Sequence, residues 1–381
     1  MIKYLGSKRR LVPVLGVVTA AIGGSTALDL FTGTTRVAQA MKRQGLHVTA
    51  VDVARYSEVF ARTYVETDAA ALDQDALAGA LAELNRLPGR AGYVTETFCV
   101  RSRFFQPFNG ARIDAVREAI EERYAGTALH PVLLTSLIEA ADRVDSTTGV
   151  QMAYVKRWAP RSYRWLELRP PALLAGSGRA VRGDACRLAG TLGEFDVAYL
   201  DPPYNQHRYY TNYHIWETLV AWDDPPHYGV ACKRTDAREA TTKSVFNSRP
   251  RMPAALREVV RSVRCRVLLL SYNDEAWIGR EALEEMCAHH EQVRTFAFDS
   301  KRYVGAQIGI YDPGGRKVGS VSRLRNLEYL VVAGPDEDVR RVAAVLESAV
   351  ATAAATGPAA VPAAPVVPAA GDPAPALAAQ Q

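Results

Sequence analysis

Short apolar runs alternate with helical patterns through most of this chain, and that alternation restricts its fold more than any other feature. A strand is expected at 26–31, a helix at 34–44 and a second strand at 47–52. Two strands joined through a helix form a βαβ unit with parallel strands. The same alternation predicts further strands at 180–183, 195–200, 265–272, 292–298 and 326–333. It predicts further helices at 9–22, 53–84, 212–221 and 275–288. An α/β fold with a mostly parallel sheet is therefore expected.

Residues 85–178 interrupt this alternation. They contain helical patterns at 109–124 and 130–147, so the interruption is expected to be mainly helical. The predicted organisation is one α/β domain made of 1–84 and 179–349, with 85–178 inserted into it. Residues 350–381 are rich in alanine and proline and carry a single charge, which predicts a disordered tail.

Cysteine content and hydropathy limit the class of protein. None of the five cysteines stands in a CxxC pair, so neither a zinc site nor a disulfide framework is expected, and a reducing cytoplasm is the expected location. No apolar run reaches the roughly 18 residues that would span a membrane. The run after Lys8 could be interpreted as a signal peptide. The helical spacing of Leu11, Leu15, Val18 and Ile22 favours a helix packed on a core.

Positive charge is unevenly distributed. The chain has a formal net charge of +5, and basic residues gather in 153–182, 233–251 and 300–325. A single such segment is compatible with a solvated loop. Three of them favour a surface that binds a polyanion such as nucleic acid.

The stretch Asp201-Pro202-Pro203-Tyr204 follows directly after an apolar strand. An exocyclic amino group on a base is a poor nucleophile, because its lone pair is delocalised into the ring. The Asp201 carboxylate and the Pro202 carbonyl can accept its hydrogens, on a backbone stiffened by Pro203. Tyr204 can stack on the base. The pattern indicates chemistry at an amino group.

A turn between strand and helix provides a candidate cofactor site. Asp29 lies near the end of the first strand, Gly33 lies in the turn that follows, and Asp52 ends the next strand. Such a turn brings backbone N–H groups against a nucleoside-type ligand, and the second acid can hold its ribose. The turn alone does not distinguish a nicotinamide cofactor from S-adenosylmethionine.

The chain resembles the alpha-group N6-adenine-specific DNA methyltransferases, of the DNA adenine methylase type. The resemblance covers roughly residues 1–335. It rests on KYLGSK at 3–8, DLFTGTT at 29–35, VD at 51–52, GDA at 183–185, DPPY at 201–204, SYN at 271–273 and LRNLEYLVV at 324–332. It implies a Rossmann-like methyltransferase sheet with a helical target-recognition insert, S-adenosylmethionine as cofactor, and methylation of adenine N6 in duplex DNA by base flipping.

The resemblance also implies a role for individual residues. Lys8 would lie near the cofactor carboxylate, Asp52 would hold the ribose and Asp184 would contact the cofactor's adenine. The complete set implied in cofactor binding is Tyr4, Lys8, Asp29, Phe31, Gly33, Asp52, Asp184 and Asp201. Asp201, Pro202, Pro203 and Tyr204 would form the catalytic element. Thr35 departs from the family, which usually has a second glycine there, and its side chain is expected to crowd the cofactor.

DNA contacts are expected mainly from the insert, through Arg101, Arg103, Lys156, Arg157, Arg161 and Arg164, and from Tyr209 and Tyr210 beside the catalytic element. Asn109 and Arg112 are further candidates for base readout, because amide and guanidinium groups read base edges in the major groove. The alternative for the insert is a helical cap that only stabilises the fold.

Several alternatives stay open at this point. The substrate could be an adenine in RNA or the N4 amino group of cytosine in DNA, or the chain could be a non-catalytic DNA-binding relative. Neither a metal nor a membrane is expected, and His207 and His214 are interpreted as packing or groove residues. A cognate restriction nuclease is a possible partner.

Overall fold

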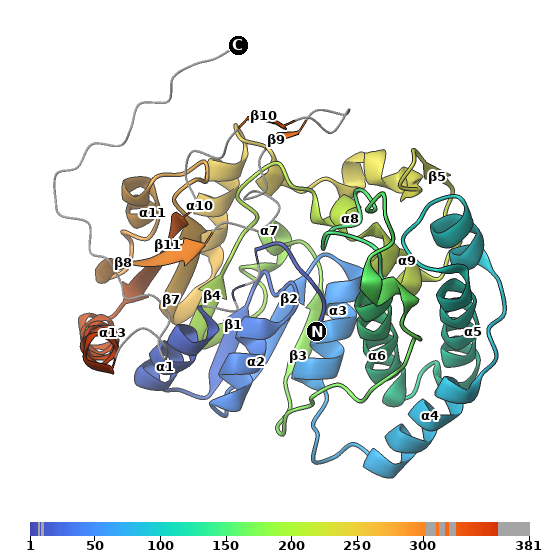
Figure 1. Ribbon diagram of the computed structural model, residues 1–381. Helices are drawn as coiled ribbons and strands as arrows, with labels where there is room; N and C mark the ends of the chain where they lie inside the picture. Colours follow the sequence, from blue (N-terminus) through green and yellow to red (C-terminus); the bar gives the residue numbers. More distant parts are fainter. Residues whose placement is uncertain (7, 9–10, 302–309, 312–316, 320–324, 357–381) are drawn as a thin grey trace.

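A seven-stranded sheet runs through the middle of the molecule in the computed structural model, which describes residues 1–6, 8, 11–301, 310–311, 317–319 and 325–356 (Figure 1). The strands lie in the order β3 (Arg179–Arg182), β2 (His47–Asp52), β1 (Thr26–Asp29), β4 (Glu194–Leu200), β7 (Arg264–Asn273), β11 (Arg325–Gly334) and β8 (Gln292–Lys301). Five neighbours, from β3 to β7, pair in parallel, whereas β11 is antiparallel to both β7 and β8. The carboxyl ends of β1, β2 and β4 therefore meet at one edge.

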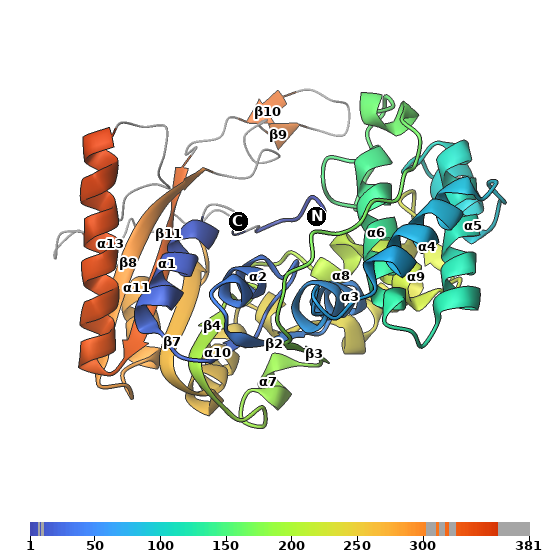
Figure 2. The ribbon, with the colours of Figure 1, turned by 90° about the horizontal axis from the view of Figure 1, so that it is seen from below.

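Helices cover both faces of the sheet (Figure 2). One face carries α1 (Val12–Ile22), α2 (Arg36–Arg43) and α13 (Asp336–Thr356), whose buried apolar residues pack with those of the strands. The other carries α7 (Ala185–Leu188), α10 (Met252–Ser262) and α11 (Arg280–Met286). Because both faces are covered, the sequences of the central strands are continuous apolar runs and do not alternate between apolar and polar residues.

The inserted region forms a helical body beside β2 and β3. It contains α5 (Pro107–Tyr124), α6 (Leu129–Val144), the π-helical turn η3 (Thr95–Val100) and the 3-10 turn η4 (Pro160–Tyr163). Helix α4 (Gln74–Arg86), most of which precedes residue 85, packs on the same body. Its apolar core is shared with α3 (Arg55–Ala61), the π-helical turn η2 (Arg62–Glu66) and α9 (His214–Ala221). The insert is thus packed directly on the helix that follows the Asp-Pro-Pro-Tyr loop.

Short elements connect the two parts. After α8 (Tyr209–Asn212) and α9, the hairpin β5 (His227–Tyr228) and β6 (Lys233–Arg234) leads into three 3-10 turns, η5 (Thr235–Arg238), η6 (Ala240–Thr242) and η7 (Val245–Asn247). A further small pair, β9 (Ile310–Tyr311) and β10 (Lys317–Gly319), lies beyond β8. Within the described part of the chain, no helix has the length and hydropathy that crossing a bilayer requires.

The predicted α/β fold with a mostly parallel sheet is confirmed, and the boundaries of its elements need correction. The helix expected at 212–221 is two helices with a break at Tyr213. The helix expected at 275–288 begins only at Arg280, and α10 was not predicted. Helix α13 continues to Thr356, inside the region expected to be disordered. Residues 357–381 and most of the basic segment 300–325 lie outside the described residues.

Candidate active site

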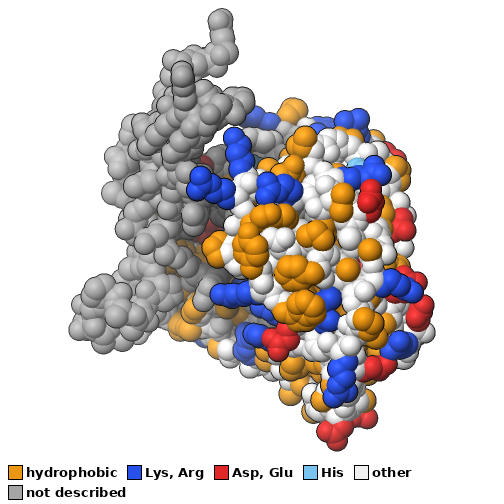
Figure 3. Space-filling model, turned by 45° about the vertical axis from the view of Figure 1, so that its right-hand side comes forward, with side chains coloured by type: hydrophobic (Ala, Val, Ile, Leu, Met, Phe, Trp, Pro, Cys, Tyr) orange, Lys and Arg blue, Asp and Glu red, His pale blue; other side chains and the backbone are white. Residues whose placement is uncertain are grey.

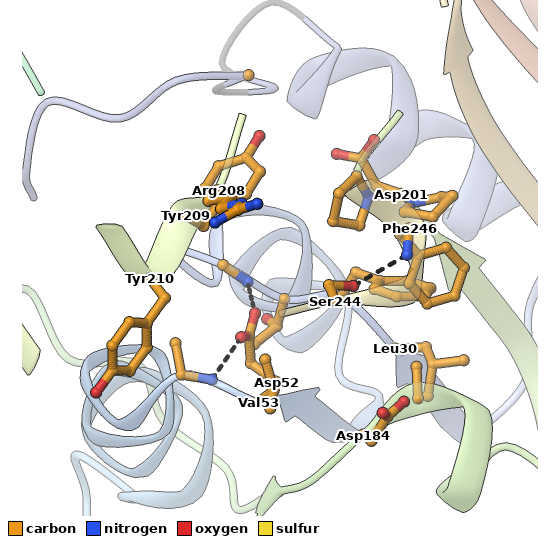
Figure 4. Close-up of a pocket in the computed structure, with 18 of the residues that line it drawn as sticks. Leu30, Asp52, Val53, Asp184, Asp201, Arg208, Tyr209, Tyr210, Ser244 and Phe246 are labelled. Carbon is orange, nitrogen blue, oxygen red and sulfur yellow. Dashed lines mark hydrogen bonds between the residues drawn. The ribbon is translucent and has the colours of Figure 1, made fainter. Parts of the chain in front are cut away.

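A pocket of about 620 Å³ opens at the edge where β1, β2 and β4 end. Every residue predicted to bind the cofactor lines it, and so do the four residues of the Asp-Pro-Pro-Tyr element and both Tyr209 and Tyr210. Figure 4 shows Asp201 and Tyr209 on one side, Asp184 and Leu30 on the other, and Asp52 between them. The structure thus brings together residues that lie far apart in the sequence, such as Tyr4 and Tyr210.

Asp29 is the most buried acid of the pocket, with 1% of its surface exposed. Its Oδ2 accepts hydrogen bonds from the Thr32 hydroxyl at 2.9 Å and from the Ala38 N–H at 3.1 Å. Its Oδ1 has no partner among the described residues. Burial raises the pKa of Asp29 to about 7. A buried oxygen without a donor costs free energy, so this atom is suited to a cationic donor on a ligand.

The turn after β1 is tied to the end of β2. Gly33 has a φ of 52°, and its N–H donates to Asp52 Oδ2 at 2.9 Å. The Ala54 N–H donates to Asp52 Oδ1 at 2.9 Å. A Cβ atom at position 33 would lie 3.2 Å from the Tyr4 ring, so both the positive φ and the close approach of this ring favour glycine. Burial raises the pKa of Asp52 above its usual range.

The far end of the pocket combines an acid with aromatic rings. Asp184 caps α7, its Oδ1 accepting from the Cys186 N–H at 2.8 Å. Phe31 meets Phe246 edge to face, with ring centroids 5.1 Å apart. In Figure 4 Phe246 lies between Asp201 and Leu30. This end can hold a flat, apolar ring with polar edges.

Asp201 forms an ion pair at the end of β4. Lys8 Nζ lies 3.1 Å from Asp201 Oδ1 and also contacts Glu328 Oε1. Burial raises the pKa of Asp201 to about 6, against the opposing effect of Lys8. The two carboxylates raise the pKa of Lys8 although burial alone would lower it. Lys8, which was predicted near the cofactor carboxylate, is thus held beside the catalytic element.

Aromatic rings surround this ion pair. Tyr204 meets Tyr272 edge to face at 5.6 Å, and Lys8 Nζ lies 5.9 Å from the centre of the Tyr204 ring. Tyr209 stacks on Tyr4 at 5.3 Å. Tyr210 points its hydroxyl to Asp236, to which it donates at 2.9 Å. The catalytic element therefore opens into an aromatic-lined space.

One wall of the pocket was not predicted at all. Residues of the segment 239–247 line it: Glu239, Thr241, Thr242, Lys243, Ser244, Phe246 and Asn247. The Asn247 side chain donates to the carbonyls of Asn205 at 2.8 Å and His207 at 3.0 Å, which ties this segment to the loop after Tyr204. The only sequence signal here was basic charge in 233–251, which says nothing about a pocket wall.

Thr35 does not crowd the pocket, contrary to expectation. It is fully buried, it has a φ of 61°, and it is not among the described residues that line the pocket. Its hydroxyl accepts a hydrogen bond from Gln39 Nε2 at 2.9 Å. The side chain therefore points into helix α2 rather than toward a ligand.

Basic side chains of the insert lie outside the pocket. Lys156, Arg157 and Arg164 are exposed, and no ion pair involves them among the described residues. Arg101 pairs with Glu96 at 2.9 Å, and Arg103 lies over the Trp158 ring at 4.7 Å. Figure 3 shows Lys and Arg side chains among hydrophobic ones on this end of the molecule. Such a mixture is suited to a nucleic acid backbone.

Two of the expected readout residues are structural instead. Asn109 is fully buried, and its amide donates to the carbonyls of Ser162 and Arg164. Arg112 is 4% exposed and donates to the carbonyls of Leu87 and Asn85. Both predictions were wrong, because each polar side chain lies inside the helical body and donates hydrogen bonds to carbonyls of the irregular backbone that packs on it.

Arg161 and His214 also have internal partners. Arg161 forms a salt bridge with Asp145 at 2.6 Å within the insert. His214 Nε2 lies 3.0 Å from the Gln151 carbonyl, and burial lowers the pKa of His214 to about 3. Among the described residues no group of three or more His, Cys, Asp or Glu side chains could hold a metal ion.

The sheet has one reversed strand near its edge, and a ligand pocket lies where β1, β2 and β4 end. This strand order and pocket define an S-adenosylmethionine-dependent methyltransferase fold. The chain belongs to the D12 class N6 adenine-specific DNA methyltransferases, whose family model matches residues 4–286. It is therefore a site-specific, adenine-specific DNA methyltransferase that uses S-adenosylmethionine, and DNA is the substrate expected for such an enzyme.

Relatives agree with this family. The type II methyltransferase M.NlaIII of Neisseria lactamica is 31% identical over 74% of this chain and 86% of its own length. The modification methylase StsI of Streptococcus sanguinis is 29% identical over 74% of this chain, which spans only 45% of that protein. A magnesium protoporphyrin IX methyltransferase from Synechocystis has a TM-score of 0.27 and 8% identity over 86% of this chain and 79% of its own, too low to support an argument.

Proposed function

We propose that this enzyme is an alpha-group methyltransferase that flips a target adenine into the pocket and presents its N6 amino group to the bound cofactor. The cofactor turn precedes the insert and the Asp-Pro-Pro-Tyr element follows it, which is the order of that group. The observation that carries the proposal is that one pocket contains both the unpartnered Asp29 Oδ1 and the Asp201 ion pair.

The residues present fit S-adenosylmethionine. Asp29 Oδ1 would accept from the ammonium group, Asp52 would hold the ribose hydroxyls, and Asp184 with Phe31 and Phe246 would hold the adenine ring. When bound, the cofactor supplies an electrophilic methyl group on a positively charged sulfur. The protein's own contribution is to position the nucleophile.

The target adenine would enter beside Lys8. Flipping a base from a duplex costs a few kcal/mol of stacking and pairing. Tyr204 would restore part of the stacking, with Tyr209 close by. Asp201 Oδ2 and the Pro202 carbonyl would accept the two amino hydrogens. This directs the nitrogen lone pair out of the ring plane.

The insert would read the DNA. Within it, Lys156, Arg157 and Arg164 are exposed without an ion pair in the described part of the chain, and Arg103 donates to the Lys156 carbonyl. Arg101 is exposed as well. The proposed organisation keeps 1–84 and 179–349 as the catalytic domain and 85–178 as the target-recognition region. A cytoplasmic location and a cognate restriction nuclease belong to the proposal, since the relatives are named type II and modification methylases.

The test uses cofactor with a labelled methyl group. The parent enzyme is incubated with duplex DNA and with RNA, and the labelled product is digested to nucleosides. Label in N6-methyladenine from DNA is expected, with Asp201→Ala as the control that binds cofactor and transfers label far more slowly. Label in N4-methylcytosine or only in RNA would overturn the proposal.

A further inference from the structure

The ammonium group of Lys8 lies between two carboxylates that come from different parts of the sheet. Asp201 directly follows β4, and Glu328 lies on β11, outside the residues that the family model matches. The side chains of Lys8, Asp201 and Glu328 are only 9%, 18% and 12% exposed. A buried cation between two buried anions is a costly arrangement unless its geometry is held firmly.

Glu328 is held by its own neighbours. The Ser271 hydroxyl donates to Glu328 Oε1 at 2.8 Å, and Asn273 Nδ2 lies 3.4 Å from Oε2. Both come from β7, the strand between β4 and β11, and Glu328 stands opposite Asn273 in the pairing. Its carboxylate is therefore fixed at the same edge of the sheet as Asp201.

We propose that Glu328 is a positioning residue for methyl transfer, which holds the Lys8 ammonium group on the Oδ1 side of Asp201 and so keeps Oδ2 for the target amino group. The inference rests on the proposed role of Asp201. Without Glu328, the Lys8 ammonium has one carboxylate left and can bridge both of its oxygens. The target amino group would then compete with a buried cation for its acceptor.

The charges around Asp201 give this arrangement a signature in the pH dependence of the reaction. Methyl transfer requires the ionised carboxylate, whose pKa burial raises to about 6, and the negative charge of Glu328 raises it further. Removing that charge lowers the pKa of Asp201. The titratable or charged side chains that act on Asp201 or respond to it are Lys8, Asp29, Tyr199, Tyr204, Tyr209 and Glu328.

The experiment measures single-turnover methyl transfer on duplex DNA between pH 5 and 8. Glu328→Gln keeps the shape of the side chain and removes its charge. We expect its plateau rate to fall roughly 10- to 100-fold, as for a misplaced catalytic group. We expect the acid limb of its profile to move to lower pH, while the Kd for S-adenosylmethionine stays within about twofold. A merely structural defect would lower the rate without that shift.

A double-mutant cycle with Lys8→Met separates the two explanations. If Glu328 acts through Lys8, adding Glu328→Gln to Lys8→Met changes the rate little. Ser271→Ala, which removes only the hydrogen bond to Glu328, should slow transfer in the same direction and by less. The Ser271→Ala variant also tests the proposal if Glu328→Gln fails to fold. Glu194→Gln, an exposed acid at the opposite end of β4, should behave as the parent.

The outcomes distinguish this inference from the proposed function. If Asp201→Ala is slow but Glu328→Gln has the plateau rate and the acid limb of the parent, the positioning role is wrong. It is also wrong if the effects of Lys8→Met and Glu328→Gln multiply independently. If Asp201→Ala itself methylates at the parent rate, the proposed role of Asp201 fails first.

Discussion

The hydroxyl of Thr35 accepts a hydrogen bond from the buried amide of Gln39, while the Thr35 backbone stands in the left-handed region with a φ of 61°. The two residues are four positions apart, at the start of α2. A threonine in this conformation costs roughly 1–2 kcal/mol relative to a right-handed one. The hydrogen bond offsets a similar amount, because an unsatisfied buried amide costs about 1–3 kcal/mol.

This balance predicts the effect of Thr35→Gly. The substitution relieves the backbone and removes the hydrogen bond, so the free energy of unfolding should change by less than about 1 kcal/mol. The Kd for S-adenosylmethionine should stay within about twofold, because the side chain does not line the pocket. Thr35→Ala is the control. It loses the hydrogen bond and keeps the strain, so it should have the lowest Tm of the three proteins. Loss of cofactor binding in Thr35→Gly would contradict this account.

Cofactor affinity should depend on pH through Asp29. Burial raises the pKa of Asp29 to about 7, and a ligand ammonium group requires the ionised form. Below pH 7 binding must therefore release a proton, and the affinity should fall by up to about tenfold per pH unit. Calorimetry between pH 5.5 and 7.5 measures this.

The matched control for that titration is Asp29→Asn, which should bind weakly with most of the pH dependence removed. Asp184→Asn should also bind more weakly but keep the slope, since Asp184 is an exposed residue. The same affinity for the parent at pH 5.5 and 7.5 would show that Asp29 does not meet the ammonium group.

The sequence was sufficient to predict which residues at strand ends gather in the pocket. Asp29, Asp52 and Asp201 each end or follow an apolar run, and the parallel sheet brings such positions together at one edge. Asn109 and Arg112 show the converse. Their residue types suggest base readout, but only the packing of α5 reveals that both side chains bond to backbone carbonyls inside the insert.

Glu328 and Phe246 could not have been predicted in the same way. Glu328 contacts Lys8 because β11 runs antiparallel beside β7. This pairing places Glu328, a residue within the strand, at the edge of the sheet where the pocket lies. Phe246 reaches the pocket through an irregular segment with no periodicity to interpret. Both contacts depend on the path of the chain in space, which local sequence patterns do not predict.

The DNA surface of the insert can be tested by charge reversal. Lys156 and Arg157 are exposed and have no ion pair among the described residues. Changing both to Glu should weaken DNA binding and reduce the salt dependence of the affinity, by about one unit of slope for each phosphate that the variant no longer neutralises. Filter binding at several salt concentrations measures both effects, and the Kd for the cofactor should not change.

Reversal of Arg340 and Arg341, which form ion pairs within α13, is the control with the same change in net charge. That helix lies at the opposite end of the sheet from the insert (Figure 2). DNA binding should then stay close to that of the parent. An equal loss in both variants would mean that net charge, rather than this surface, determines affinity.

The C-terminal boundary of the fold lies within α13. Its buried apolar residues are Val339, Val342, Ala343 and Leu346, so a chain that ends at Ala349 retains them all. That chain should keep the Tm and the activity of the full chain. A chain that ends at Arg341 loses three of them and should be destabilised by several kcal/mol, about 2–5 kcal/mol for each large side chain removed. Thermal melting compares the three proteins, and aggregation of the chain that ends at Ala349 would contradict the boundary.

The catalytic element makes the most specific prediction. Asp201→Ala removes one acceptor of the target amino group and leaves Lys8 paired with Glu328, so the pocket retains a compensated charge. Losing one preorganised polar contact of this kind costs about 3–4 kcal/mol in the transition state, or roughly 10²–10³ in rate. The variant should bind S-adenosylmethionine and DNA nearly as the parent does, yet methylate slowly. Tyr204→Ala should also slow transfer because the flipped base no longer stacks, whereas Tyr204→Phe, which keeps the ring, should be milder. Single-turnover transfer, measured beside cofactor and DNA binding for each variant, separates these effects. If Asp201→Ala methylates duplex DNA at close to the parent rate, Asp201 does not hold the amino group.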